Sequence, residues 1–332
     1  MPLTKNLFEG QRLTVEESID LTAESLRSYG ERYRHWFVAY SGGKDSTATI
    51  TLLVWLIEQG LVPRPESLTV QYSDTRMELT PLQVTAFELT GELRRRGVDA
   101  NVVMPELDDR FFVYMFGRGV PPPSNTFRWC TSQLKIEPMQ KAMIERAVSL
   151  GFGEMVWNEK REKHEYKGFG REKLLTITGV RLGESAARDE RIITSCSRDG
   201  AECGQGWLQT SAKEGLNDTL APLLHWRVCF VWDWLMGMIE DHGFKTKPVA
   251  EVYGVAEDGS AAENGTRTGC VGCNLASKDT ALDTLLRLPQ WAYLAPYKRL
   301  KPLYAELKRP SMRLRKHDEK KLDKALRRLN LL

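Results

Sequence analysis

Long apolar runs are missing from this chain of 332 residues. No stretch approaches the roughly 20 apolar residues that a membrane-spanning helix needs. Residues 1–5 (MPLTK) contain no apolar signal core, so we expect a cytoplasmic protein. Hydrophobic content of 42% and charged content of 27% are ordinary, so the composition indicates a soluble globular protein of one large or two modest domains.

Cysteines are few, six in all, and in a cytoplasmic protein they are poor candidates for disulfides. Cys270 and Cys273 flank Val-Gly, a spacing that lets two thiolates hold one metal or cluster. Cys196 and Cys203 are separated by a polar segment that could fold toward that pair, or they are unligated surface thiols. Four ligands would complete an iron–sulfur or a zinc site, and the spacing does not separate the two.

The other two cysteines have different neighbours. Cys130 follows an irregular, proline-rich loop and is either an alternative fourth ligand or a sulfur carrier. Arg128 lies close to it in sequence and is expected to lower the pKa of the thiol. Cys229 sits among apolar residues, which predicts a buried structural thiol.

A Walker A motif is also absent, yet a phosphate loop is present. Residues 37–47 (FVAYSGGKDST) form an apolar run, a Gly-Gly turn and the start of a helix that Gly60 would end. Glycines allow close approach of the backbone to a phosphate, and the first N–H groups of a helix are unpaired. Lys44 adds a positive charge, and hydroxyl groups come from Ser41, Ser46 and Thr47. The loop therefore predicts an anion site. The alternative is a purely structural Gly-Gly turn that happens to carry a lysine.

Strands and helices alternate along the chain to about residue 240. We expect strands near residues 36–40, 68–72, 99–104 and 174–180, with helices between them. This alternation predicts a mostly parallel, doubly wound α/β sheet. Ligands of such sheets bind beyond the carboxyl ends of the strands, so Asp74 and Thr75 are expected near the nucleotide.

Charged residues follow the expected strand at 174–180. Arg181 and Arg188 flank Glu184 at its carboxyl end, which suits a polyanion site, although an exposed charged turn is an alternative. Residues 158–171 are charged throughout, and we expect them to form an exposed excursion that is prone to disorder.

Together these motifs resemble a known family. Residues 41–46 (SGGKDS) resemble the PP-loop of ATP pyrophosphatases. They are followed by Asp74-Thr75, by residues 128–138 with the RWCT motif, and by residues 179–188 with the GVR motif, in the order of the phosphoadenosine-phosphosulfate (PAPS) reductase superfamily. The resemblance covers about residues 30–275. It is closest to the branch that contains the sulfurtransferase of bacterial DNA phosphorothioation systems (Dnd or Ssp type).

The resemblance implies a Rossmann-like fold and an enzyme that binds ATP with Mg²⁺. The nucleotide would contact Ser41, Gly42, Gly43, Lys44, Asp45, Ser46, Thr47, Asp74, Thr75 and Arg181. The reaction would depend on Lys44, Asp45, Arg181, Arg188 and Cys130. A non-bridging phosphate oxygen of DNA would attack the α-phosphate of ATP, and sulfur from a cysteine desulfurase partner would then displace AMP. The resemblance also favours a [4Fe–4S] cluster over zinc at the cysteines, and it implies further subunits of a modification complex.

Two departures from the family leave alternatives open. PAPS reductases end in a short tail whose cysteine does the chemistry, but no cysteine follows Cys273 here. Adenylylsulfate reductases with a cluster carry two adjacent cysteines where this chain has Trp129-Cys130. A sulfonucleotide reductase is therefore the second interpretation, and a non-catalytic nucleotide-binding subunit is the third.

We divide the chain into four parts. An N-terminal helix occupies residues 1–30, where Thr14 and Glu17 predict a capping box. An ATP pyrophosphatase domain follows over 31–245, a cysteine-bearing segment over 246–290 and a helical basic tail over 291–332. Thirteen basic residues after Tyr297 face only four acidic ones. Such a tail binds nucleic acid, or it is a solvated amphipathic helix.

Overall fold

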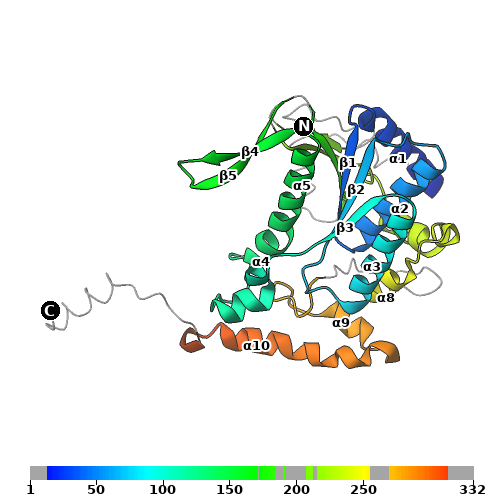
Figure 1. The fold of residues 1–332 in the computed structure, drawn as a ribbon. Coiled ribbons are helices and arrows are strands. Elements are labelled where there is room, and N and C mark those ends of the chain that lie inside the picture. The colour runs from blue at the N-terminus through cyan, green and yellow to red at the C-terminus, as the bar shows by residue number, and fades with distance from the viewer. Residues whose placement is uncertain are drawn as a thin grey trace, which may run out of the picture.

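A six-stranded sheet forms the centre of the computed structural model, which describes residues 13–170, 172–183, 190, 207–211, 215–254 and 269–312 (Figure 1). The strand order is β3-β2-β1-β6-β8-β7. All neighbouring pairs are parallel except β7 with β8. The strands are β1 (His35–Tyr40), β2 (Ser67–Ser73), β3 (Asp99–Val103), β6 (Leu174–Ile177), β7 (Trp207–Gln209) and β8 (Asn217–Ala221). The chain builds outward from β1 to β3 and then crosses to β6, so β1 and β6 flank the switch point of the sheet.

Helices cover both faces of this sheet, which confirms the predicted α/β fold (Figure 1). The side chains of β1 show how the two faces differ. Trp36, Val38 and Tyr40 join the larger core, whereas Phe37 packs with the smaller core that includes Met143 of α5. The main helices are α1 (Val15–Gly30), α2 (Lys44–Glu58), α3 (Thr80–Arg95), α4 (Trp129–Thr131), α5 (Glu137–Ser149), α7 (Val228–Asp233), α8 (Lys247–Tyr253), α9 (Thr280–Leu285) and α10 (Leu300–Leu307). None of the helices in the described part of the chain is long and apolar enough to span a membrane.

Shorter helical turns join these elements. Turns of 3-10 helix cover Leu107–Asp109, Glu240–His242, Pro289–Arg299 and Pro310–Met312, and turns of π-helix cover Val113–Gly117, Ser132–Ile136 and Trp234–Met238. The predicted capping box of α1 is confirmed. The Thr14 hydroxyl accepts from the Glu17 N–H at 3.2 Å, and the Glu17 carboxylate accepts from the Thr14 N–H at 2.8 Å.

An antiparallel hairpin projects from the body after α5 (Figure 1). Strand β4 (Gly153–Asn158) pairs with β5 (Lys163–Gly168) over six residue pairs. The expected exposed excursion over residues 158–171 is confirmed in that much of this segment is exposed, but the expectation that it is prone to disorder is wrong for Lys163–Gly168, which form a paired strand. Gly153 permits the close pairing, because a Cβ there would lie 2.4 Å from the Lys167 carbonyl oxygen.

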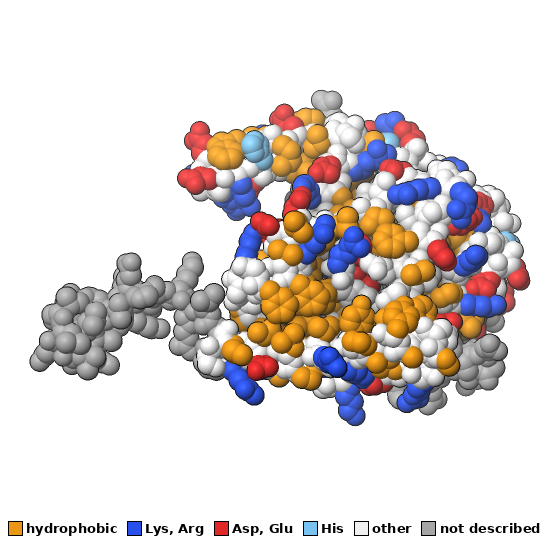
Figure 2. Space-filling model, turned by 60° about the horizontal axis from the view of Figure 1, so that its bottom comes forward, with side chains coloured by type: hydrophobic (Ala, Val, Ile, Leu, Met, Phe, Trp, Pro, Cys, Tyr) orange, Lys and Arg blue, Asp and Glu red, His pale blue; other side chains and the backbone are white. Residues whose placement is uncertain are grey.

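A separate small core joins segments that are distant in sequence. Met77, Phe111, Met115, Trp129, Leu134 and Tyr304 are buried together, with Cys130, Cys270 and Leu300 packed against them. Figure 2 brings the underside of the molecule forward and shows hydrophobic side chains gathered on this face. The segment that precedes Cys130 also carries large hydrophobic side chains that are exposed to solvent. They include Leu107, Phe112, Phe116 and Phe127. The small core thus ties the cysteine-bearing segment and α10 to the loop that precedes Cys130.

Candidate active site

The phosphate loop lies between β1 and α2, at the switch point of the sheet. Gly42 adopts φ +76°, a left-handed conformation that favours glycine, and a Cβ there would lie 3.4 Å from the Tyr72 ring. Gly43 is the N-cap residue of α2. Its carbonyl oxygen accepts from the hydroxyls of Ser46 at 3.0 Å and Thr47 at 2.9 Å. The loop therefore has the fixed backbone and the helix N-terminus that the sequence predicted for an anion site.

Two basic side chains converge on one carboxylate in this loop. Asp45 accepts from Lys44 Nζ at 2.7 Å through Oδ2 and from Arg181 Nε at 2.5 Å through Oδ1. Burial alone would raise the pKa of Asp45, but the charges and hydrogen bonds of Arg181 and Lys44 hold it below its ordinary value. Arg181 is 5% exposed and also donates to the Trp226 carbonyl oxygen at 3.2 Å. Asp45 thus fixes both cations beside the helix N-terminus, which leaves a net positive charge there for an anionic ligand.

Gly179 brings the end of β6 against the first turn of α2. A Cβ at this position would lie 2.9 Å from three backbone atoms of Asp45 and Ser46. Only glycine lets the two backbones approach this closely, and the approach places Arg181 beside Asp45. The Gly-Val-Arg motif therefore has a steric role as well as an electrostatic one.

Tyr253, at the end of α8, also contacts the loop, and sequence reasoning missed it. Its hydroxyl accepts from the Lys44 N–H at 3.3 Å, and Lys44 Nζ lies 5.2 Å from the centre of its ring. The sequence assigns α8 to the cysteine-bearing segment, but Val249, Ala250 and Val252 pack into the larger core. No local motif marks Tyr253, because the contact depends on how α8 packs.

Asp74 and Thr75 lie at the carboxyl end of β2, beside the phosphate loop, and both are fully buried. Asp74 Oδ1 accepts from the Arg76 N–H at 2.9 Å and from Gln83 Nε2 at 3.0 Å. The Thr75 hydroxyl donates to Glu78 at 2.6 Å. Arg76 adopts φ 62°, which is rare for a residue with a side chain and marks a strained turn. Asp74 Oδ2 accepts no hydrogen bond in the described part of the chain, but it lies 3.5 Å from Arg76 Nε in an ion pair.

Cys270 and Cys273 occupy a turn that is anchored to the same strand end. The Cys273 N–H donates to the Cys270 carbonyl oxygen at 3.0 Å, and the Val271 N–H donates to the Met77 carbonyl oxygen at 2.6 Å. Gly272 adopts φ +61°, and a Cβ there would lie 2.7 Å from the Cβ of Leu300 on α10. The turn is therefore held from two sides, and both cysteine residues are half-buried.

Cys130 and Lys135 lie next to this cysteine turn. Burial raises the pKa of Cys270, and the charge of Lys135 opposes that effect. In return, the thiols, Cys270 above all, raise the pKa of Lys135. Burial also raises the pKa of Cys130, so the expectation that Arg128 lowers it is wrong. Arg128 is exposed and donates to Asn125 at 3.1 Å instead.

The predicted metal ligands are Cys196, Cys203, Cys270 and Cys273. Cys196, Cys203 and Arg188 lie outside the described residues. Among the residues that are described, no group of three or more His, Cys, Asp or Glu side chains is arranged to hold a metal ion. Cys270 and Cys273, with Cys130 nearby, offer sulfur donors that suit a cluster or zinc but do not complete a set of four. Cys229 is exposed, so the predicted buried thiol is wrong: it lies on the outer side of α7, whereas Phe230 and Val231 point inward.

Comparison with known proteins assigns the family. The model of the phosphoadenosine phosphosulfate reductase domain matches residues 35–242, which contain the phosphate loop, Cys130 and Arg181. No match was found among curated proteins. Among solved structures, the chain is similar to a phosphate complex of PAPS reductase from Candida auris, with 11% identity and a TM-score of 0.37 over 68% of this chain and 87% of that one. Because the family model spans more than half of its length, the chain belongs to the phosphoadenosine phosphosulfate reductase domain family.

Proposed function

We propose that this protein is an ATP pyrophosphatase that adenylates a phosphate acceptor, the DNA backbone, for sulfur insertion. The observation that carries the proposal is the Lys44–Asp45–Arg181 cluster at the N-terminus of α2. A helix N-terminus with two fixed cations suits the triphosphate of a nucleotide better than a single anion. The cysteine turn at the neighbouring strand end adds sulfur chemistry to the same edge of the sheet.

The proposed first step is an in-line substitution at the α-phosphate of ATP. A non-bridging oxygen of the acceptor phosphate forms a bond to the α-phosphorus, the bond to the bridging α–β oxygen breaks, and pyrophosphate leaves. Lys44, Arg181 and the N–H groups of α2 would stabilise the negative charge that develops on the phosphates. Mg²⁺, when bound with ATP, would neutralise part of that charge.

The proposed second step replaces the activated oxygen by sulfur. A persulfide formed with a cysteine desulfurase partner supplies the sulfur: its terminal sulfur bonds to the acceptor phosphorus as AMP departs. A second thiol then attacks the inner sulfur, so the S–S bond breaks, the phosphorothioate is released, and an external thiol reductant reduces the disulfide that remains. Cys130 is the residue we propose to carry sulfur, because it lies beside the cysteine turn and remains partly accessible. Cys270 and Cys273 would hold a [4Fe–4S] cluster together with Cys196 and Cys203.

Sulfonucleotide reduction is the second candidate, and the family match favours it. The same two cations would then bind the phosphate of a phosphosulfate substrate. That reaction needs a thiol nucleophile. Of the described cysteines, Cys130 would be the one to take that role.

Product analysis separates the two candidates. Protein prepared without oxygen is incubated either with ATP, Mg²⁺, DNA and a sulfur-loaded desulfurase, or with PAPS and a thiol reductant. We expect pyrophosphate from the first mixture and no sulfite from the second. Lys44→Ala should abolish pyrophosphate release while the fold is kept, and Lys160→Ala, on the exposed β4–β5 turn, is the matched control. Sulfite release without pyrophosphate would replace the proposal by the second candidate.

A further inference from the structure

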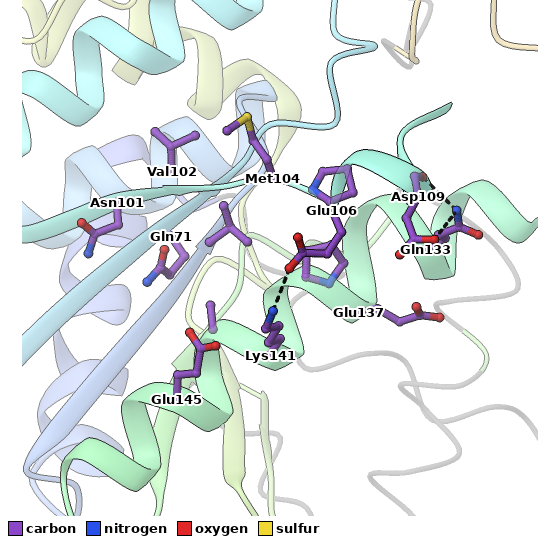
Figure 3. Close-up of a pocket in the computed structure, with 14 residues that line it drawn as sticks. Gln71, Asn101, Val102, Met104, Glu106, Asp109, Gln133, Glu137, Lys141 and Glu145 are labelled. Carbon is purple, nitrogen blue, oxygen red and sulfur yellow. Dashed lines mark hydrogen bonds and ion pairs between the residues drawn. The ribbon is translucent and has the colours of Figure 1, made fainter. Parts of the chain in front are cut away.

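A pocket of about 470 Å³ lies between α5 and the edge of the sheet, away from the phosphate loop (Figure 3). Its walls come from β2, β3, the segment after β3, and the helical segment that runs into α5. It contains none of the residues assigned to the nucleotide or to the cysteine site. The lining residues are Gln71, Asn101, Val102, Val103, Met104, Pro105, Glu106, Asp109, Gln133, Glu137, Pro138, Lys141, Ala142 and Glu145.

The charges of this pocket are mostly negative and are spread along it. Four carboxylates line it against one cation, Lys141. Lys141 donates to Glu106 at 2.8 Å, and this ion pair neutralises the negative charge in the middle of the pocket. Glu137 and Glu145 stand four residues to either side of Lys141 on one face of α5, about 12 Å apart along the helix axis. Figure 3 shows Glu145 near one end of the pocket and Glu137 near the other, which leaves both ends anionic.

Gln71 supplies an independent indication of a ligand. This β2 side chain is only 8% exposed, and its Oε1 has no hydrogen-bond partner among the described residues. A buried polar atom without a partner is costly, so its retention points to a group that binds there. Gln71 and Asn101 line the same end of the pocket as Glu145 (Figure 3).

The separation between the carboxylates indicates which class of cation the pocket would bind. A divalent metal needs several oxygen atoms around one point. In the described part of the chain no three acidic, histidine or cysteine side chains come close enough for that. The wall between the two anionic ends carries Val102, Pro138 and Ala142, which suit methylene groups. We propose that the pocket binds a linear aliphatic polyamine, with ammonium groups at Glu145 and Glu137 and methylenes along α5.

Calorimetric titration of the full-length protein with spermidine tests this proposal, which does not rest on the proposed function. We expect saturable binding that weakens at least about tenfold in a Glu137→Gln, Glu145→Gln double variant, because each change removes a charge-assisted contact. Glu154→Gln, an exposed carboxylate on β4, should bind like the natural protein. Absence of saturable binding, or equal binding by the double variant and the control, would overturn the proposal. Displacement of spermidine by an equal concentration of Mg²⁺ would overturn it as well.

A Gln71→Met variant provides a second and separate measurement. Methionine fills a similar volume without a buried amide, so we expect an equal or higher melting temperature without ligand. We also expect spermidine binding to weaken, with a smaller thermal shift on its addition. A lower melting temperature with unchanged spermidine binding would show that Gln71 serves only the packing of β2, and it would contradict the polyamine site.

Discussion

Replacement of Gly179 by alanine tests whether the fit between β6 and α2 builds the phosphate site. The added Cβ would meet the Asp45 carbonyl carbon, the Asp45 carbonyl oxygen and the Ser46 nitrogen, each at 2.9 Å. These are backbone atoms, so no side-chain rotation relieves the contact. The first turn of α2 must move away from β6 by several tenths of an ångström.

The expected loss of stability can be taken from the effect of overpacking in other protein interiors. Small-to-large changes in a packed interior destabilise by about 1–3 kcal/mol. In domains of 150–250 residues each kcal/mol lowers the melting temperature by about 2–4 °C, so we expect a drop of roughly 2–12 °C. If the loop binds ATP as proposed, the affinity for nucleotide should fall by a larger factor, because Asp45 and Ser46 belong to the loop itself. A displacement of this kind weakens a positioned contact by about tenfold or more.

Two assays and one matched variant make the result interpretable. Thermal unfolding measures the stability, and titration with a non-hydrolysable ATP analogue measures the affinity. Gly237→Ala is the control, since Gly237, in the helical turn Trp234–Met238, has open space where an added Cβ would lie, with no atom within 4 Å, and no positive φ. It should leave affinity unchanged and stability equal or higher by up to about 1 kcal/mol. The reasoning is refuted if Gly179→Ala binds the analogue as tightly as Gly237→Ala does.

Three further predictions concern His225, Asp218 and Gly272. Burial lowers the pKa of His225, whose Nε2 lies 3.0 Å from the Ser18 carbonyl oxygen, so the unfolded chain protonates first. Urea unfolding should therefore show stability falling below about pH 6.5, by at most about 1.4 kcal/mol per pH unit, and His225→Gln should flatten this trend. Burial would raise the pKa of Asp218, but its hydrogen bonds lower it overall, so its stabilising effect is lost as pH falls through a value below 3.8, and Asp218→Asn should remove that acid dependence. Gly272→Ala should push Leu300 away and loosen the cysteine turn, which a faster reaction of its thiols with a disulfide reagent would reveal; an unchanged rate would contradict the packing of Leu300 against the turn.

Local patterns in the sequence were enough for much of the fold. Apolar runs predicted β1 and β2, the alternation of strands with helices predicted a mostly parallel sheet, and Thr14 with Glu17 predicted the start of α1. These signals depend on neighbours within a few residues, which is why they can be read from the chain alone.

Features that depend on packing between distant segments were missed or misjudged. Strand β5 is charged along its length and forms because β4 pairs with it. Tyr253 reaches Lys44 across more than two hundred residues of sequence. The pKa of Cys130 follows from burial in the small core, whereas sequence proximity suggested that Arg128 would control it. Neither hydrophobic periodicity nor a short motif carries such information.

The small core around Cys270 also sets the order in which the protein can mature. Met77 holds one side of the cysteine turn, and Leu300 and Tyr304 close the other side. A chain leaves the ribosome N-terminus first, so the turn has no fixed position until α10 has emerged. If these thiols receive a metal or a cluster, loading follows the emergence of α10. A nascent chain that stalls before α10 would then present loose, oxidation-sensitive thiols that quality control can recognise.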